Sequence, residues 1–116
     1  MAQNVIYTLA KKFSLRIIQL YSFLYQEKKE YVISKQLYRS STSIGANIAE
    51  SIYAQSEADY VNKLKISLKE ASESKYWLEL LYESEMIIQQ EYDSLINDLN
   101  TIIGTIINII NKIEKK

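Results

Sequence analysis

The side chains best suited to chemistry are a group of serines, but the chain lacks the partners that would activate them. Ser40, Ser41 and Ser43 lie within four positions of one another. A serine becomes a nucleophile when a neighbouring base takes its proton. The chain has no His and no Cys, so it lacks the commonest general base, the thiol nucleophile and the commonest metal ligands. We therefore interpret the serines as small packing residues or as hydroxyls that bond to backbone, and we expect no enzyme.

Carboxylates are the remaining candidate metal ligands. Glu70 and Glu73, or Glu79 and Glu83, are spaced to lie side by side on a helix. The metal sites of ferritin-like bundles also need histidines from the same helices, and this chain has none. Ion pairing such as Lys69 with Glu73 is the commoner use of such spacing. No glycine-rich phosphate loop or zinc spacing is present. We expect no metal and no cofactor.

Charge is divided unevenly between the two halves of a chain with zero net charge. Residues 1–49 carry a net +5 and residues 50–116 a net −5. The commoner explanation is that the halves neutralise each other where helices or subunits pack. The alternative is that the basic half faces phosphate. In that case the candidate nucleic-acid-binding residues are Lys11, Lys12, Arg16, Lys35 and Arg39.

The chain also contains ten tyrosines, which suggests a role for aromatic stacking. Tyr7, Tyr21 and Tyr25 share a flank of the first expected helix, and Lys11 lies nearby. Aromatic rings beside Lys or Arg can hold single-stranded bases. Tyrosine also serves core edges and subunit interfaces, and that use is the more frequent one.

The pattern of apolar residues predicts four long helices. Apolar side chains recur at steps of three and four, and the chain has no Pro and only two Gly, so little interrupts the helices. The expected helices cover residues 4–27, 35–54, 56–85 and 91–114. Ser34 is the expected N-cap of the second helix, and Ser56 with Asp59 resembles a capping box at the start of the third. We predict an all-α fold, an antiparallel up-down four-helix bundle, as one domain over residues 1–116.

The second expected helix has a broad face of apolar and small residues. Its central line is Leu37, Ser41, Ile44, Ile48 and Ile52. Neighbouring positions widen it by nearly a quarter turn: Tyr38, Gly45, Ala49 and Tyr53. We expect this helix to be packed on two sides. The rest is a polar strip of Gln36, Ser40, Ser43, Asn47 and Glu50, with Arg39 at its edge.

Three members of that strip are predicted to be structural. If the helix is enclosed, Asn47 and Glu50 need hydrogen-bond partners, as does Ser43. They then tie the helix to a neighbouring loop or fix its register across a subunit boundary. Direct contact with a ligand is the alternative.

The third expected helix carries a second apolar line, nearly opposite its core-facing line. Its members are Ile66, Trp77 and Leu80. Apolar side chains on the outside of a bundle usually mark a partner surface. With Tyr53 they form the predicted oligomer interface, anchored by Trp77. The alternative is that Trp77 packs over the edge of a neighbouring helix.

Two segments carry a resemblance to a known family. The first is Leu37-x-Arg39-Ser40-Ser41-x-Ser43-Ile44-x-x-Asn47-Ile48-Ala49-Glu50, and the second is Lys69-Glu70-Ala71-x-Glu73-x-x-Tyr76-Trp77-Leu78-x-Leu80-Leu81. Both resemble the four-helix-bundle proteins encoded in intervening sequences of bacterial 23S ribosomal RNA genes. The likeness spans nearly the whole chain. The family usually has Gly after the Glu of the first segment, where this chain has Ser51.

The resemblance implies an up-down bundle, often assembled as a ring-like homopentamer. The family is also similar to the accessory variability protein of diversity-generating retroelements, which works with a reverse transcriptase and nucleic acid. Fold kinship does not transfer function. Two hypotheses follow. The first is a non-enzymatic homo-oligomer, a pentamer by preference, that binds RNA or DNA. The second is a protein-interaction scaffold without nucleic-acid binding. No stretch is apolar enough to span a membrane, and we expect a cytoplasmic location.

Overall fold

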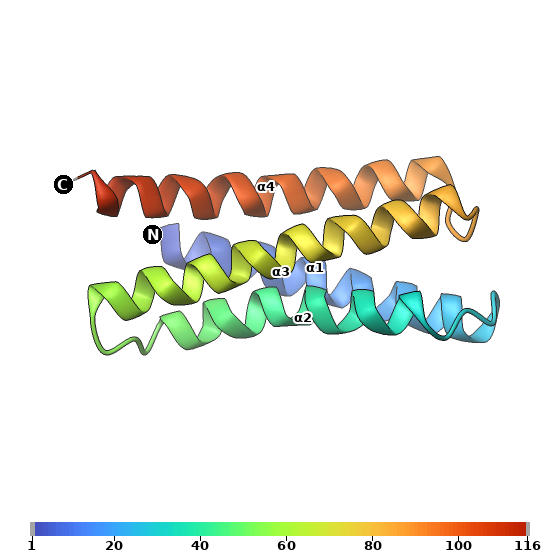
Figure 1. Ribbon diagram of the computed structural model, residues 1–116, viewed down its shortest axis with the longest axis horizontal. Coiled ribbons are helices and arrows are strands. Elements are labelled where there is room, and N and C mark those ends of the chain that lie inside the picture. Colours follow the sequence, from blue (N-terminus) through green and yellow to red (C-terminus); the bar gives the residue numbers. More distant parts are fainter. Residues whose placement is uncertain (1, 116) are drawn as a thin grey trace.

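The computed structural model describes residues 2–115, which form four helices in an up-and-down bundle (Figure 1). The helices are α1 (Ala2–Gln26), α2 (Ile33–Ser51), α3 (Glu57–Glu83) and α4 (Gln89–Glu114). Each runs opposite to the one before it across a short turn, and the bundle measures 48 × 21 × 19 Å. Within residues 2–115, no helix is both long and apolar enough to cross a membrane. The predicted all-α four-helix bundle is confirmed.

Contacts between consecutive helices set the antiparallel register. Gly45 of α2 lies against Ser14 of α1: a Cβ at Gly45 would be 3.5 Å from the Ser14 hydroxyl oxygen. Ser67 of α3 donates a hydrogen bond of 2.9 Å to the carbonyl oxygen of Ile44. Lys75 of α3 donates one of 3.2 Å to the side-chain oxygen of Asn100. Each helix therefore packs on its chain neighbours, and α4 closes the bundle on α1.

All four helices contribute to one apolar core. Phe13, Ile44, Leu64 and Leu99 are among its fully buried side chains. Burying one aliphatic side chain of this size contributes about 1.5–3 kcal/mol. Six serines are buried with the apolar residues, and among the described residues no buried side-chain polar atom lacks a hydrogen-bond partner.

The ends of α2 differ from the sequence-based expectation. Ser34 is not the N-cap, because α2 begins at Ile33 and the cap position is Val32, whose side chain makes no capping bond. The carboxylate of Glu30 caps the helix instead, accepting the backbone N–H groups of Val32, Ile33 and Ser34 at 3.2, 2.9 and 2.6 Å. Capping rules consider short side chains at the residue that directly precedes the helix. They therefore did not predict a cap by a glutamate in the preceding turn.

The C-terminal end of α2 also corrects a prediction. The helix ends at Ser51, so Ile52 leaves the core line and is 41% exposed. At α3 the predicted cap is confirmed, since the Ser56 hydroxyl accepts the Asp59 N–H at 3.0 Å. In the opposite direction, the Asp59 carboxylate accepts the backbone N–H of Gln55 at 3.2 Å.

Candidate functional site

The serines of the second helix meet the third helix. Ser40 and Ser41 are fully buried, and both hydroxyls contact the hydroxyl of Ser74, at 2.8 and 3.0 Å. Small side chains let α2 and α3 approach closely, and the paired hydroxyls satisfy one another. No titratable side chain appears in these contacts. The serines hold two helices together, and this agrees with their interpretation as packing residues.

Arg39 lies at the exposed edge of the same contact. Its guanidinium donates to the carboxylate of Glu73 and lies 3.5 Å from that of Glu70. Trp77 Nε1 donates to the same Glu73 carboxylate at 3.2 Å. Arg39 therefore faces two negative charges from α3.

Arg16 is occupied in a similar way on the opposite side of the bundle. It donates to Asp98 of α4 at 2.7 Å and to the Ser94 hydroxyl at 3.0 Å, and Glu91 lies 3.6 Å away. Both arginines of the basic half therefore neutralise carboxylates of the acidic half within one chain. This is the first of the two explanations for the uneven charge.

The three predicted lysines are placed differently. Lys11, Lys12 and Lys35 are exposed, and none of them has an ion-pair partner within the described part of the chain. Lys35 lies in the first turn of α2, beside the end of α1, whereas Lys11 lies in the first half of α1. At about 1.5 Å per residue, the two are roughly 20 Å apart along the bundle. The five predicted cations therefore do not form one cluster.

The three predicted structural polar residues are bonded within the chain. Ser43 donates to the carbonyl oxygen of Arg39 at 2.8 Å, and Asn47 donates to that of Ser43 at 2.9 Å. Glu50 pairs with Lys63 of α3 at 2.9 Å, and this hydrogen bond raises the pKa of Lys63. Among the described residues, Glu50 thus links α2 to α3, while Ser43 and Asn47 bond within α2. Whether they also contact a ligand or a second subunit stays a prediction.

The predicted interface residues occupy two environments. Ile66, Trp77 and Leu80 are half-buried, and Trp77 packs against the edge of the core beside the ring of Tyr76, with ring centroids 5.1 Å apart. Tyr53, just beyond α2, is 85% exposed. Trp77 therefore combines the packing role given as its alternative with a partly open ring, and the interface stays a prediction.

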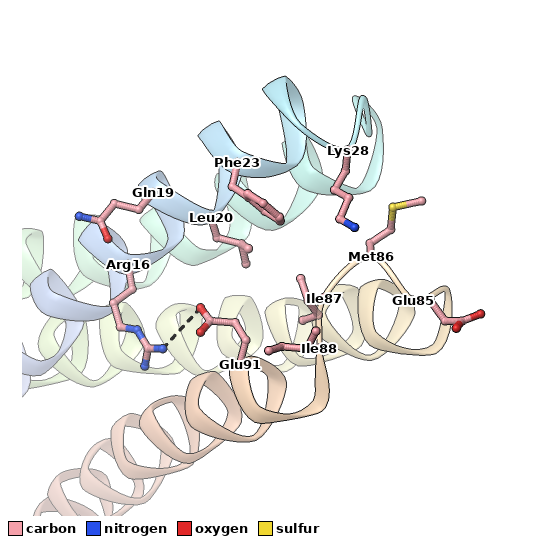
Figure 2. A pocket seen from close by; sticks show the side chains of 10 residues that line it. All are labelled: Arg16, Gln19, Leu20, Phe23, Lys28, Glu85, Met86, Ile87, Ile88 and Glu91. Atoms are coloured by element: carbon pink, nitrogen blue, oxygen red, sulfur yellow. Dashed lines mark ion pairs between the residues drawn. The ribbon is translucent and has the colours of Figure 1, made fainter.

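A groove opens between the second half of α1 and the turn that joins α3 to α4 (Figure 2). It has a volume of about 400 Å³. Leu20 and Phe23 line it from α1, Ile87 and Ile88 line it from the turn, and the pair of Arg16 with Glu91 lies at one end. Phe23 and Ile88 are 45% and 69% exposed. The cleft is mainly apolar, and Lys28 and Glu85 are charged residues of its lining besides Arg16 and Glu91.

A second surface is shared by α1 and α2, and we call it the α1–α2 face. It joins a shallow hollow to a row of tyrosines at the turn between the helices. The hollow is lined by Tyr7, Lys11, Ser14, Thr42, Gly45, Ala46 and Ala49. The row consists of Tyr21, Tyr25, Tyr31 and Tyr38. Lys35 lies between the last two in sequence, in the first turn of α2 and one helical turn before Tyr38.

Sequence reasoning found part of this face. It grouped Tyr7, Tyr21 and Tyr25 through their spacing on one helix, but it missed the contacts of Tyr31 and Tyr38. Those contacts depend on the register between α1 and α2, and a period within one helix carries no information about register. In the sequence, the four-residue spacing of Tyr21 and Tyr25 was the one sign of a contact between tyrosine rings in this row.

The fold and these surfaces define a class: a four-helix bundle with an apolar groove at one end and a tyrosine-lined face on α1 and α2. Among the described residues, no group of three or more His, Cys, Asp or Glu side chains is arranged to hold a metal ion. Residues 2–108 match the model of the 23S rRNA-intervening sequence protein family. The chain belongs to that family.

Comparison with solved structures agrees with this assignment. The chain is similar to a protein of unknown function from the S23 ribosomal protein family of Bacteroides thetaiotaomicron. The two are 51% identical, and the match covers 96% of this chain and 99% of the other with a TM-score of 0.94. No curated protein matches the chain.

Proposed function

We propose that the protein is a non-enzymatic, homo-oligomeric bundle of the cytoplasm that binds RNA or DNA through the basic surface of α1 and α2. The observation that carries the proposal is the contrast among the five predicted cations. Arg16 and Arg39 face carboxylates, whereas Lys11, Lys12 and Lys35 are exposed to solvent. The proposed phosphate contacts are therefore these three lysines.

The distribution of charge favours one side of the bundle for a polyanion. The α1–α2 hairpin contains only three carboxylates, Glu27, Glu30 and Glu50. Glu30 is bound to backbone N–H groups and Glu50 to Lys63. The acidic residues of α3 and α4 repel phosphate from the other side. Such an asymmetric field orients a nucleic acid as it approaches.

Self-association is supported by apolar side chains that the single chain leaves open. Leu15 and Ile18 on α1 are 54% and 40% exposed, and Tyr53 is 85% exposed. With the half-buried Trp77 and Ile66, they provide candidate contacts for a homo-oligomer, for which the family resemblance suggests a pentamer. Light scattering tests this, since Trp77→Ala or Ile66→Glu should reduce the assembled mass. An unaltered oligomer in both variants would exclude the Trp77 surface as the interface.

Charge reversal in two matched sets tests nucleic-acid binding. Replacing Lys11, Lys12 and Lys35 by Glu should abolish binding to a structured RNA, and the wild-type affinity should fall steeply with salt. Reversing Arg16 and Arg39 instead should change affinity less, because those side chains already face carboxylates. Equal affinity of wild type and the triple lysine variant would contradict the proposal.

The second candidate function is a protein-interaction scaffold, and the apolar groove between α1 and the α3–α4 turn favours it. Exposed side chains such as Phe23 and Ile88 are typical anchors for a protein partner. In this case a pulldown should recover a protein after nuclease treatment, and Ile88→Glu should release it. Salt-sensitive RNA binding should then be absent.

A further inference from the structure

We infer that the α1–α2 face binds single-stranded nucleic acid, with bases stacked on its tyrosines and phosphates held by Lys11 and Lys35. The inference rests on the proposed function and specifies its ligand and its site. Four observations carry it: the contacts of the tyrosines, the hollow beside them, the charge of the face and its length.

The tyrosines form a continuous row across the two helices and the turn between them. The ring centroids of Tyr38 and Tyr21 are 4.9 Å apart, those of Tyr21 and Tyr25 are 5.9 Å apart, and those of Tyr25 and Tyr31 are 4.7 Å apart. Neighbouring rings are tilted or edge-on, with interplanar angles of 44° to 63°, so no two of these rings are stacked face to face. Tyr25, Tyr31 and Tyr38 are 49%, 49% and 37% exposed. Open ring faces of this kind stack on bases of any sequence.

The hollow beside the row is lined mainly by small side chains. Gly45, Ala46 and Ala49 on α2 and Ser14 on α1 leave a space of about 270 Å³ along the bundle. Its far end is bounded by Tyr7, with the ammonium of Lys11 5.9 Å from the centre of the Tyr7 ring. An extended chain laid in this hollow passes an aromatic ring and a lysine at each end.

The charged side chains of the face are both positive. Its residues include Lys11 and Lys35 and no carboxylate. Glu30, which precedes Tyr31, accepts three backbone N–H groups at the start of α2. A polyanion therefore meets two cations and no fixed opposing charge in the face itself.

The dimensions and chemistry favour single strands over a duplex. Tyr7 and Tyr25 are separated by about 27 Å along α1, at about 1.5 Å per residue, which is long enough for several nucleotides. Bases in a duplex already stack on their neighbours, and sequence-specific RNA recognition mostly uses unstacked bases in single strands. A second copy of the protein could also cover this face in a two-fold pair. The lysines of the two copies, Lys11 and Lys35, would then lie among like charges, which disfavours a second copy as the occupant.

Ring removal at constant fold tests the inference. The probes are fluorescent single-stranded RNA and DNA of about 10 nucleotides, within the range one binding domain covers, and a blunt RNA duplex. The double variant Tyr25→Leu with Tyr38→Leu keeps apolar side chains but loses the rings. It should bind single strands about five-fold to 150-fold more weakly for each base that stacks. The matched variant Tyr25→Phe with Tyr38→Phe should bind within about two-fold of wild type, and wild type should prefer single strands to the duplex.

The outcomes separate this inference from the proposed function. If the leucine variant binds as wild type while Lys11→Glu with Lys35→Glu fails to bind, stacking is refuted and phosphate binding stands. Equal binding of duplex and single strands refutes stacking in the same way. If wild type binds neither probe, both proposals fall. Loss of the oligomer in the leucine variant, without any binding by wild type, identifies the face as an interface between copies. If circular dichroism shows that the double variant folds poorly, the binding of Tyr25→Leu alone is compared with wild type. Tyr25 is half exposed, so its replacement should leave the fold intact.

Discussion

The two sides of α2 carry similar small side chains but meet different surroundings. On the α3 side, Ser40 and Ser41 are buried against Ser74 and leave no space. On the α1 side, Gly45 and Ala49 line a hollow that is open to solvent. Small residues therefore have two roles in one helix. They let α3 pack closely on one side, and they leave a shallow surface beside α1 on the other. The first role is architectural, and the second is the one we connect with function.

The largest effect on stability is expected where α2 packs against α3, which is the closed side of α2. Ser74→Leu inserts a bulky side chain where α2 and α3 are in contact and removes the partner of two buried hydroxyls. Overpacking, together with the Ser41 hydroxyl left without its partner, should lower the free energy of unfolding by about 2–3 kcal/mol, whereas the Ser40 hydroxyl keeps its bond to the Leu37 carbonyl oxygen. Urea denaturation measures it, with Ser72→Leu on the exposed face of α3 as the control. Equal stability of the two variants would show that the contact is not close.

The start of α2 should be sensitive to acid. Burial raises the pKa of Glu30, but hydrogen bonds from the N–H groups of Ile33, Ser34 and Val32 outweigh it, so the pKa is lowered from 4.5. A lowered pKa means that the carboxylate stabilises the fold above the unfolded-state pKa and that this stabilisation is lost as pH falls through the folded value. Glu30→Ala should cost about 1 kcal/mol at neutral pH.

Denaturation at a series of pH values checks this prediction. The difference in stability between wild type and Glu30→Ala should shrink as pH falls below 4.5. Glu27→Ala, in the same turn and without a capping bond, is the matched control and should behave as wild type. A difference between wild type and Glu30→Ala that does not change with pH would mean that the carboxylate does not cap α2.

Gly45→Ala changes the open side of α2, which faces α1, and it should raise the stability of the fold instead of lowering it. The added methyl group would lie 3.5 Å from the Ser14 hydroxyl oxygen and 3.7 Å from the Cβ of Ala10, which are ordinary contacts. Alanine is a better helix former than glycine, so stability should rise by about 0.5–1 kcal/mol. Thermal unfolding measures the change. A destabilised variant would mean that α1 and α2 are packed as closely as α2 and α3.

The smallest effect is expected at the edge of the closed side. Arg39→Gln removes a largely exposed ion pair with Glu73, and such pairs contribute at most about 1 kcal/mol. The affinity for single-stranded RNA should stay within about two-fold, whereas Lys35→Gln on the same helix should weaken it. If Arg39→Gln weakened binding more than Lys35→Gln, the assignment of the open side as the binding surface would be wrong.

Sequence reasoning predicted the parts of this fold that depend on local periodicity. The four helices, the α3 cap at Ser56 and the packing role of Ser40 and Ser41 follow from spacing and residue type. The cap by Glu30 did not follow, because it depends on the path of the turn. The pairing of Arg16 with Asp98 was also hidden, since it joins residues far apart in the sequence.

The candidate site was predictable only in part, for the same reason. Lys11, Lys35 and three of the tyrosines were recognised as residues that suit nucleic acid. Their arrangement was not, because the neighbours of Tyr38 are set by the register of α1 against α2. The sequence alone also grouped Arg39 with the lysines, although α3 supplies its two carboxylate partners.

Photocrosslinking shows directly which surface of the protein contacts single-stranded nucleic acid. A 4-thiouridine-containing single-stranded RNA is irradiated with the wild-type protein, and the crosslinked peptides are mapped by mass spectrometry. We expect crosslinks at the tyrosine row of the α1–α2 face, at Tyr25, Tyr31 and Tyr38, and their loss at high salt. Crosslinks confined to the exposed surfaces of α3 and α4, or none at any salt concentration, would contradict this expectation.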